Sequence, residues 1–393
     1  MIPETRPVHM VVRTVFDEAA WDRLVGEWAE LFQSSPQAAT PLRFAWLRHW
    51  WRVYGPVYGA AGLRILTCWR GSRLVGVLPL YEGRLHGKLL GPRRIGFLST
   101  GEAEFEESSP DYLNLLVAAG EEQACLSALS DRLQEMRWDY LELLDVPEGS
   151  PLLSVGAADG RRNGAEVKAR GSCAVANLEG GFEAYLQRLS GNGRQQARRL
   201  VREGEKSAAR LQIVSGPERR AAFEELIRLH QDRWQRQGKQ GCFAAARFTE
   251  FHRSLVDELE PRGEAILARL SLAGQPLAVL YGFVTAKKFD FYQSGVRVGD
   301  HGPLRSPGTL AHLLLMRELC ERGVVRYDFL RGSASYKERL ATDRTRMFSL
   351  QIWRPTPRSI AYRLARFLAR AARRTFKQVS RRRRSKPAVE GAR

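Results

Sequence analysis

Cysteine is scarce in this sequence, and long apolar runs are absent. The five cysteines stand far apart, with no C-x-x-C pair and no Cys/His cluster at metal-ligand spacing: Cys68, Cys125, Cys173, Cys242 and Cys320. These spacings argue against a disulfide framework and against a zinc site. No stretch approaches the ~20 apolar residues of a membrane span, and the opening MIPETRPVHMVVRTVF has no apolar core of signal-peptide length. We therefore expect a cytoplasmic protein without a bound metal ion.

Acidic residues are almost missing from the last part of the chain. Residues 356–393 contain thirteen Lys/Arg and one Glu, so this tail carries +12 of the total charge of +19 and the other 355 residues carry +7. Its apolar residues fall near one side of a helix: Ile360, Leu364, Phe367, Leu368, Ala371 and Phe376. We expect an amphipathic or disordered tail that binds an anionic membrane surface. Nucleic acid is the alternative partner, and a base-composition bias without any binding role is a third interpretation.

The rest of the chain is long and apolar enough for two domains. The full chain has 393 residues, of which 44% are apolar. This length and apolar content predict two hydrophobic cores. One order of elements occurs twice, namely hairpin, strand, helix, strand, beginning at LRILTCWRGSRLVGVLPLYEGR and again at AILARLSLAGQPLAVLYGFVTAKK. A Gly-, Ala- and Arg-rich stretch separates the copies. We predict an N-terminal domain at 1–165, a C-terminal domain at 166–355 and a tail at 356–393.

Two helical stretches in the second half carry candidate substrate contacts. His230 lies on an apolar helical face, where a buried histidine with a structural role is the more common outcome than a functional one. The stretch GNGRQQARRLVREGEKSAAR places Arg194, Arg198, Arg202 and Lys206 at intervals of four, so four cations share one face. This stripe is either a solvated face or a site for an anionic substrate.

The stretch HGPLRSPGTLAHLL has glycines and prolines immediately before an apolar helix. Exposed N–H groups at a helix N-terminus bind phosphate oxygens, and glycine permits close approach of the anion. The candidate phosphate-binding residues are Arg305, Ser306, Gly308 and Thr309. The alternative is structural, with Ser306 as an ordinary N-cap and Pro307 as the first helical residue.

A third stretch, VRYDFLRGSASYKERL, begins as a buried strand and ends with Tyr336 and Lys337 side by side after a flexible Gly-Ser-Ala-Ser segment. Lys337 could stabilise an oxyanion or a phosphate, and the alternative is a packed Tyr336 with an exposed Lys337. Asp328 at the strand end is a candidate base, with Glu338 and His230 as further candidates. Pairing of Asp328 with Arg331 is the competing interpretation.

The segments LSLAGQPLAVLYGFV, FDFYQSGV, RSPGTLAHLLLMRELCERGV and YDFLRGSASYKERL together resemble the FemAB/CelD-like branch of the GNAT acetyltransferase superfamily, over about residues 170–355. SPDYLNLL extends the likeness into the first half. The resemblance implies two tandem GNAT-like α/β domains, mixed sheets flanked by helices, and acetyl-CoA or another acyl-CoA as co-substrate. This sequence departs from the usual glycine-richer phosphate loop.

The resemblance also implies roles for individual residues. It places Lys337, Tyr336 and Asp328 at the catalytic cleft and favours Arg198 or Arg202 as a substrate contact. His230 and Tyr292 are the further candidate substrate contacts. The function it implies is acyl-CoA-dependent N-acylation of an amino sugar or related envelope or exopolysaccharide precursor. The tail, which the resemblance does not cover, could add peripheral contact to the inner face of the membrane through its charge. The alternatives are a FemAB-like aminoacyl-tRNA-dependent transferase and a non-catalytic assembly or nucleic-acid-binding protein on a degenerate GNAT fold.

Overall fold

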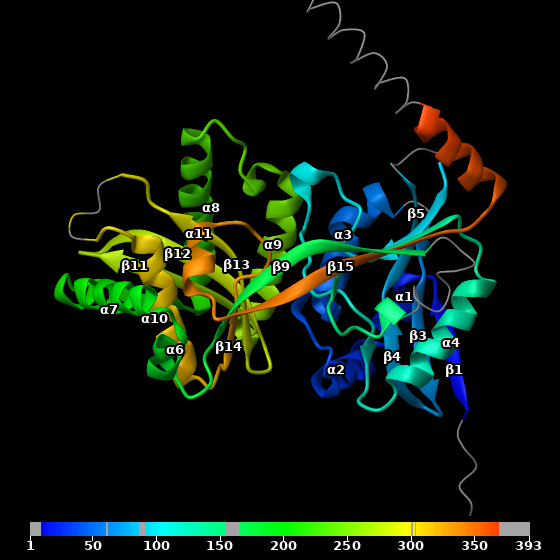
Figure 1. The fold of residues 1–393 in the computed structure, drawn as a ribbon, viewed down its shortest axis with the longest axis horizontal. Helices are drawn as coiled ribbons and strands as arrows, with labels where there is room; N and C mark the ends of the chain where they lie inside the picture. The colour runs from blue at the N-terminus through cyan, green and yellow to red at the C-terminus, as the bar shows by residue number, and fades with distance from the viewer. Residues whose placement is uncertain are drawn as a thin grey trace, which may run out of the picture.

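The computed structural model describes residues 9–59, 62–85, 91–154, 165–299, 302 and 304–368. Two α/β halves lie side by side and are joined by a pair of long strands (Figure 1). The elements of the first half are β1 (Met10–Val15), α1 (Glu18–Asp22), α2 (Val25–Ser34), η1 (Thr40–Leu42), α3 (Phe44–Tyr58), β2 (Gly62–Leu63), β3 (Ile65–Arg70), β4 (Arg73–Leu78), β5 (Leu80–Arg84), β6 (Arg93–Phe97), η3 (Glu104–Glu106), β7 (Leu116–Val117), α4 (Glu122–Glu135) and β8 (Tyr140–Pro147).

The second half begins with a long strand and repeats the sheet-plus-helix order. Its elements are β9 (Ala165–Asn177), α6 (Phe182–Arg188), α7 (Gly191–Lys206), β10 (Arg210–Val214), η4 (Gly216–Glu218), α8 (Arg219–Arg236), η5 (Cys242–Ala244), α9 (Ala246–Leu259), η6 (Glu260–Arg262), β11 (Ala265–Leu272), β12 (Gln275–Thr285), β13 (Lys288–Val296), α10 (Pro307–Glu321), β14 (Arg326–Asp328), α11 (Ser335–Leu340) and β15 (Asp343–Trp353).

The strands of the second half lie in one sheet, and those of the first half are divided between two. The second half has the order β10-β11-β12-β13-β14, and the first half has β1-β3-β4-β7 in a separate sheet and β8-β6-β5-β2 at the end of the large sheet. The successive strands β4 and β5, separated by Pro79, take the place of the single strand β12. The predicted fold class, two tandem GNAT-like α/β units, is confirmed.

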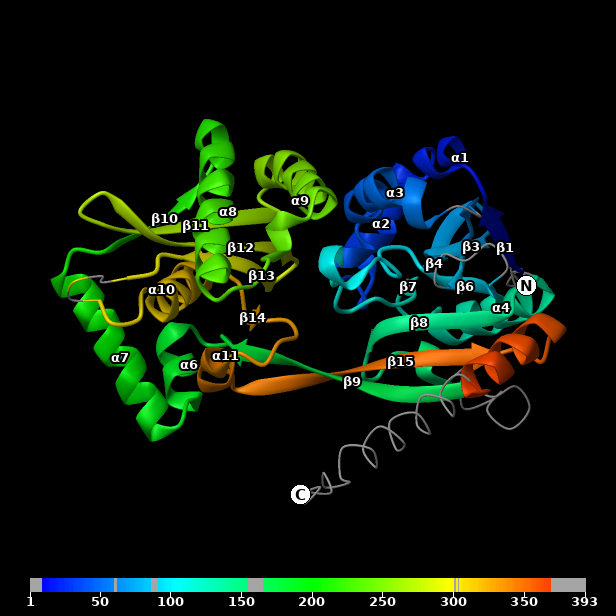
Figure 2. The ribbon, with the colours of Figure 1, turned by 90° about the horizontal axis from the view of Figure 1, so that it is seen from above.

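Strands β9 and β15 join the halves into a single sheet of eleven strands. β15 pairs antiparallel with β9 from Asp343↔Val175 to Ile352↔Ala165, and its other edge pairs with β8 from Met347↔Pro147 to Trp353↔Tyr140. Figure 2 shows this ribbon running from one half to the other. The predicted boundary between residues 165 and 166 is therefore not a clean division, because the last strand of the second half completes the sheet of the first.

The apolar side chains form two clusters, but these do not correspond to the two halves. One cluster contains the first half together with α8, α9 and one face of β11 and β12, and the other lies between the opposite face of the same strands and α6, α7 and α10. Alternation along β12 produces this division, since Tyr281 faces the first cluster and Leu280 the second. The two clusters agree in number with the two expected cores, but they do not follow the two halves, because helices cover both faces of β11 and β12.

The tail begins as a helix over residues 357–368 that follows β15. Ala371 and Phe376, two of the apolar residues predicted to line its apolar side, lie outside the described residues. Within the described ranges, no helix is both long enough and apolar enough to cross a bilayer.

Candidate active site at the split between β13 and β14

Strands β13 and β14 run parallel for three residues and then separate. Their paired positions are Lys288↔Arg326, Phe289↔Tyr327 and Asp290↔Asp328. β13 continues to Val296 with β12 as its partner on the other side. Among the described strands, none pairs with the edge of β13 beyond Asp290, so this edge can offer backbone N–H and C=O groups to an extended ligand.

A β-bulge lies just beyond the point of separation. Tyr281 of β12 pairs with Gln293, and Gly282 pairs with Phe291, so Tyr292 is the extra residue. A bulge turns consecutive side chains toward one face, and here both Tyr292 and Gln293 make contacts on the side of α8 and α9. Phe291 packs with the cluster around α10 on the other side. The bulge thus aims Gln293 into a cavity described below.

Tyr292, a predicted substrate contact, uses its hydroxyl in contacts within the protein. The hydroxyl donates to the Ser108 carbonyl at 2.5 Å and lies 3.0 Å from Nε2 of His252. Burial raises the pKa of Tyr292, so the phenol stays protonated. The residue links the bulge to the loop of the first half that contains Ser108.

Lys337 lies on the short helix α11 and binds the main chain just after the end of β14. Its Nζ donates to the carbonyls of Phe329 at 2.6 Å and Arg331 at 2.7 Å, and a third carbonyl, that of Leu330, is 3.4 Å away. The residue is 8% exposed, and desolvation lowers the pKa of Lys337. Two of its three N–H groups therefore hold the main chain just past the split, and the third makes only a long contact.

Tyr336 packs on the α10 side of the split. Its ring stacks on His312 at a centroid separation of 5.1 Å, and Nδ1 of His312 lies 2.7 Å from the Tyr327 hydroxyl. Desolvation lowers the pKa of His312 to about 3 and raises that of Tyr336 to about 12. Both groups are therefore neutral at neutral pH, with Tyr336 partly exposed beside Lys337.

Asp328, predicted as a candidate base, is directed toward the first half of the chain. It is fully buried, and its Oδ2 accepts from the Tyr112 hydroxyl at 2.5 Å and lies 3.4 Å from Nζ of Lys288. Arg331 does not pair with Asp328 but contacts Asp111 and, at 2.8 Å, Asp145. Asp328 at the end of β14 and Arg331 just after it therefore both hold this part of the chain against the first half.

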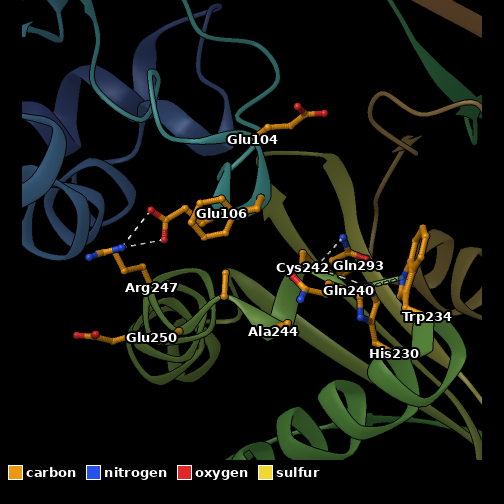
Figure 3. A pocket seen from close by; sticks show the side chains of 14 residues that line it. Glu104, Glu106, His230, Trp234, Gln240, Cys242, Ala244, Arg247, Glu250 and Gln293 are labelled. Carbon is orange, nitrogen blue, oxygen red and sulfur yellow. Dashed lines mark hydrogen bonds and ion pairs between the residues drawn. The ribbon is translucent and has the colours of Figure 1, made fainter. Parts of the chain in front are cut away.

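A cavity of about 610 Å³ opens on the α8 and α9 side of β13 (Figure 3). His230, Trp234, Cys242 and Gln293 line one part of it. The Trp234 indole donates to Nε2 of His230 at 2.9 Å, and the Gln293 amide lies 3.5 Å from the Cys242 sulfur. The histidine is only 2% exposed, and burial lowers its pKa to about 4. His230 is therefore neutral, and its Nε2 already accepts a hydrogen bond.

The other part of this cavity is formed by the first half and α9, and it carries an excess of carboxylates. Glu106 is buried and pairs with Arg247 at 3.1 Å, while the exposed Glu104 and Glu250 line the rim. Three carboxylates against one guanidinium make the entrance attractive to a cation and unfavourable for an anion.

The predicted phosphate-binding residues lie where β13 leads into α10. Ser306 is the N-cap residue of α10 but makes no side-chain cap hydrogen bond, and Pro307 is the first helical residue. A Cβ at Gly308 would stand 3.2 Å from Cγ2 of Val296, so the helix start lies directly on the end of β13. Arg305 is exposed, and Thr309 is partly exposed in the first turn. The first turn contains no acidic residue, which suits an anion.

A second hollow, of about 330 Å³, lies beside this helix start. It is lined by the end of α8 and the end of β13, including Arg233, Arg236 and Arg297. Arg236 pairs with Asp232 at 3.0 Å. For Arg233 and Arg297, the described part of the chain contains no ion-pair partner. Two guanidiniums are thus free to bind phosphate oxygens.

The predicted cationic stripe of α7 lies on the other face of the sheet from the cavity. Arg198 pairs with Glu183 of α6 at 2.8 Å, and Arg202 is exposed. The buried side of α7 packs on α10, where a Cβ at Gly204 would stand 2.9 Å from Leu310. The structure therefore brings together Lys337, Tyr336 and α10, with Tyr292 at the bulge and His230 in the cavity on the other face. Helix α7 packs on α10, but Arg198 pairs with Glu183 and Arg202 is exposed.

Four lining residues were not anticipated, namely Gln293, Cys242, Arg233 and Arg297. Gln293 is the one with a visible signal, because the alternation of charged and aromatic residues in KFDFYQSGV stops at Tyr292 and a polar residue follows. Among the residues with defined positions, no group of three or more His, Cys, Asp or Glu side chains could hold a metal ion.

Comparison with known proteins agrees with this geometry. Residues 191–338 match the family model for the acetyltransferase (GNAT) domain. The structure of FemX superposes with a TM-score of 0.56 at 11% identity, covering 82% of this chain and 95% of FemX. The C-terminal domain of a putative lysylphosphatidylglycerol synthetase from Agrobacterium fabrum gives a TM-score of 0.52 at 10% identity, covering 88% of this chain and 97% of that domain. No curated protein sequence matches the chain.

The split strand pair and the matched domain define an acyltransferase. Residues 191–338 match the GNAT acetyltransferase domain, and the described chain has a tandem GNAT fold like that of FemX.

Proposed function

We propose that the protein transfers an acyl group from acetyl-CoA or another acyl-CoA to the amino group of an amino sugar or a related envelope or exopolysaccharide precursor. The observation that carries this proposal is the unpaired edge of β13 beyond Asp290, which runs from the bulge at Tyr292 to the start of α10. The amides of a pantetheine arm can pair with such an edge as an added strand. The phosphates then lie at a helix start without acidic residues.

The cavity on the α8 and α9 side supports an amine as the acceptor. It borders β13 at Gln293, next to the bulge, so an amine there lies on the opposite side of the split from Lys337. Glu104 and Glu250 at the rim favour an ammonium ion. The third N–H of Lys337, with only the 3.4 Å contact to Leu330, is the donor that can stabilise the developing oxyanion.

Aminoacyl-tRNA is the second candidate donor, because the hollow containing Arg233 and Arg297 would also suit nucleic-acid phosphates. The test is to supply each acyl-CoA of a panel with glucosamine-type amines and to measure release of free coenzyme A, and in parallel to supply aminoacyl-tRNA with the same acceptors. Turnover with an acyl-CoA supports the proposal. Turnover with aminoacyl-tRNA alone would replace it by the second candidate, and no turnover with either donor would contradict both.

Donor variants sharpen this test. Arg233→Glu combined with Arg297→Glu should raise the KM for acyl-CoA at least about tenfold with little change in kcat, because the lost contacts bind ground state and transition state alike. Arg23→Glu, an exposed position in the first half, is the matched control. An unchanged donor KM in the double variant would show that the donor phosphates bind elsewhere.

A further inference from the structure

The helix at residues 357–368 is fixed to the body of the protein along one side. The Thr356 hydroxyl donates to Asp139 at 2.6 Å, Arg358 pairs with the same carboxylate at 3.4 Å, and Ser359 is buried. The ring of Tyr362 stacks on Trp353 of β15 at a centroid separation of 5.9 Å. The helix is therefore held in one orientation at the end of the large sheet, where Figure 1 shows it in orange-red.

The opposite side of this helix is apolar and exposed. Its four large apolar side chains are Ile360, Leu364, Phe367 and Leu368, which are 55%, 57%, 68% and 58% exposed. At 3.6 residues per turn they fall within an arc of about 100°, and Ser359 and Tyr362 lie on the other side of the helix. They are among the most exposed large apolar residues of the described chain, and here they form a continuous stripe.

Positive charge surrounds this stripe. The helix carries Arg358, Arg363 and Arg366 and no acidic residue, and residues 369–393 add ten Lys/Arg and one Glu in sequence. Arg363 and Arg366 lie over the rings of Trp353 and Tyr362, at 5.9 and 5.8 Å, between the body and the apolar stripe. An apolar stripe flanked by arginines is the pattern of a helix that lies in the headgroup region of an anionic bilayer.

We propose that residues 357–368 dock the protein on an anionic lipid surface, with Ile360, Leu364, Phe367 and Leu368 inserted among the acyl chains and the arginines at the phosphate level. Nucleic acid would satisfy the arginines but would leave the four aliphatic and aromatic side chains in water. The body then has a fixed orientation at the membrane, because the anchored side of the helix is part of the folded protein.

The test uses the full chain and two double variants. Leu364→Glu with Phe367→Glu removes the centre of the stripe at exposed positions, where folding does not depend on it. Val25→Glu with Val57→Glu is the matched control, because these residues are 53% and 48% exposed on α2 and α3. Binding is measured by co-sedimentation with vesicles of phosphatidylcholine alone and of phosphatidylcholine mixed with phosphatidylglycerol, and separately by filter binding of tRNA.

The wild type and the control should bind the mixed vesicles and bind phosphatidylcholine vesicles much more weakly. The variant of Leu364 and Phe367 should bind the mixed vesicles about 100-fold more weakly, since each exposed apolar side chain contributes roughly tenfold. Its binding to tRNA should change far less. Equal vesicle binding by this variant and the wild type would overturn the proposal. So would a wild-type dimer that does not bind vesicles and that dissociates in the variant, because a second copy would then cover the stripe.

Discussion

Replacing Lys337 by methionine should destabilise the protein by about 3 kcal/mol. Methionine has a similar length but no donor, so the carbonyls of Phe329 and Arg331 lose the N–H groups that now lie 2.6 and 2.7 Å away. A buried acceptor left without its partner costs ~1–3 kcal/mol, which gives about 2–6 kcal/mol for two. Removal of a desolvated ammonium offsets part of this loss, because burial already lowers the pKa of Lys337.

The assay is urea unfolding followed by tryptophan fluorescence, with Arg339→Met as the matched control. Arg339 lies two residues along the same helix and is exposed, so its change should stay within about 0.5 kcal/mol. Lys337→Arg should recover only part of the stability, because a planar guanidinium cannot direct donors to converging carbonyls as an ammonium does. If Lys337→Met were as stable as the control, Lys337 would not be holding the end of β14.

The activity of Lys337→Met distinguishes a structural role of Lys337 at the end of β14 from a direct role in catalysis. Under conditions where Lys337→Met is fully folded, loss of an oxyanion donor should lower kcat by about 10²–10³-fold with little change in donor KM. A donor phosphate contact would instead raise the KM. A variant that is destabilised but retains its kcat would limit Lys337 to its structural role.

Two further predictions concern buried charge. Burial lowers the pKa of His312 to about 3, while the unfolded residue titrates near 6.5. Its stabilising contribution is therefore present above about pH 6.5 and is lost as the pH falls, with a loss on the order of 3 kcal/mol at pH 4. The difference in unfolding free energy between pH 7 and pH 4 should therefore be smaller in His312→Gln, and an unchanged difference would contradict this assignment. Arg331→Met should cost about 3–5 kcal/mol, because it leaves Asp111 without its cation and Asp145 with Arg170 alone. Burial already raises the pKa of Asp111 to about 6, so the cost in urea unfolding should be smaller at pH 5 than at pH 8; equal costs would show that these carboxyls are not charged in the folded protein.

The fold was predictable because its signals are local. The hairpins at Arg70–Arg73 and Leu272–Gln275, and the helix beginning at Pro307, follow from turn residues and apolar periodicity within short segments. The pairing of β15 with β8 was not predictable, because nothing in β15 alone distinguishes a partner about 200 residues earlier from a nearer one. Register between distant strands is set by packing of the whole sheet.

The site was predictable only in part, because many of its contacts join residues that are far apart in the sequence. The sequence indicated that the residues after β14 form a wall of the cleft, but it could not show where their polar groups point. Asp328 hydrogen-bonds to Tyr112, more than 200 positions away along the chain, and Lys337 bonds to main-chain carbonyls that leave no trace in side-chain patterns. The cavity at Gln293 arises from a bulge and from a loop of the other half, and neither is visible in the motif.

The two copies of the unit differ in a way that assigns the chemistry to the second. In the first copy, β6 and β7 belong to different sheets, so there is no continuous strand edge equivalent to that of β13. The helix α4, equivalent to α10, begins at Glu122 after Glu121, which pairs with Arg70 at 2.6 Å. Carboxylates at a helix start stabilise the helix but repel a phosphate. α10 begins at Pro307 with no acidic residue in its first turn.

The first copy nevertheless contributes to the site of the second. It supplies Tyr112 to Asp328 and Asp111 to Arg331, so both residues at the end of β14 are fixed from outside their own domain. It also supplies Glu106 to the wall of the cavity opposite His230. The second copy therefore carries the open strand edge of the proposed active site, and the first copy supports the end of β14 beside it.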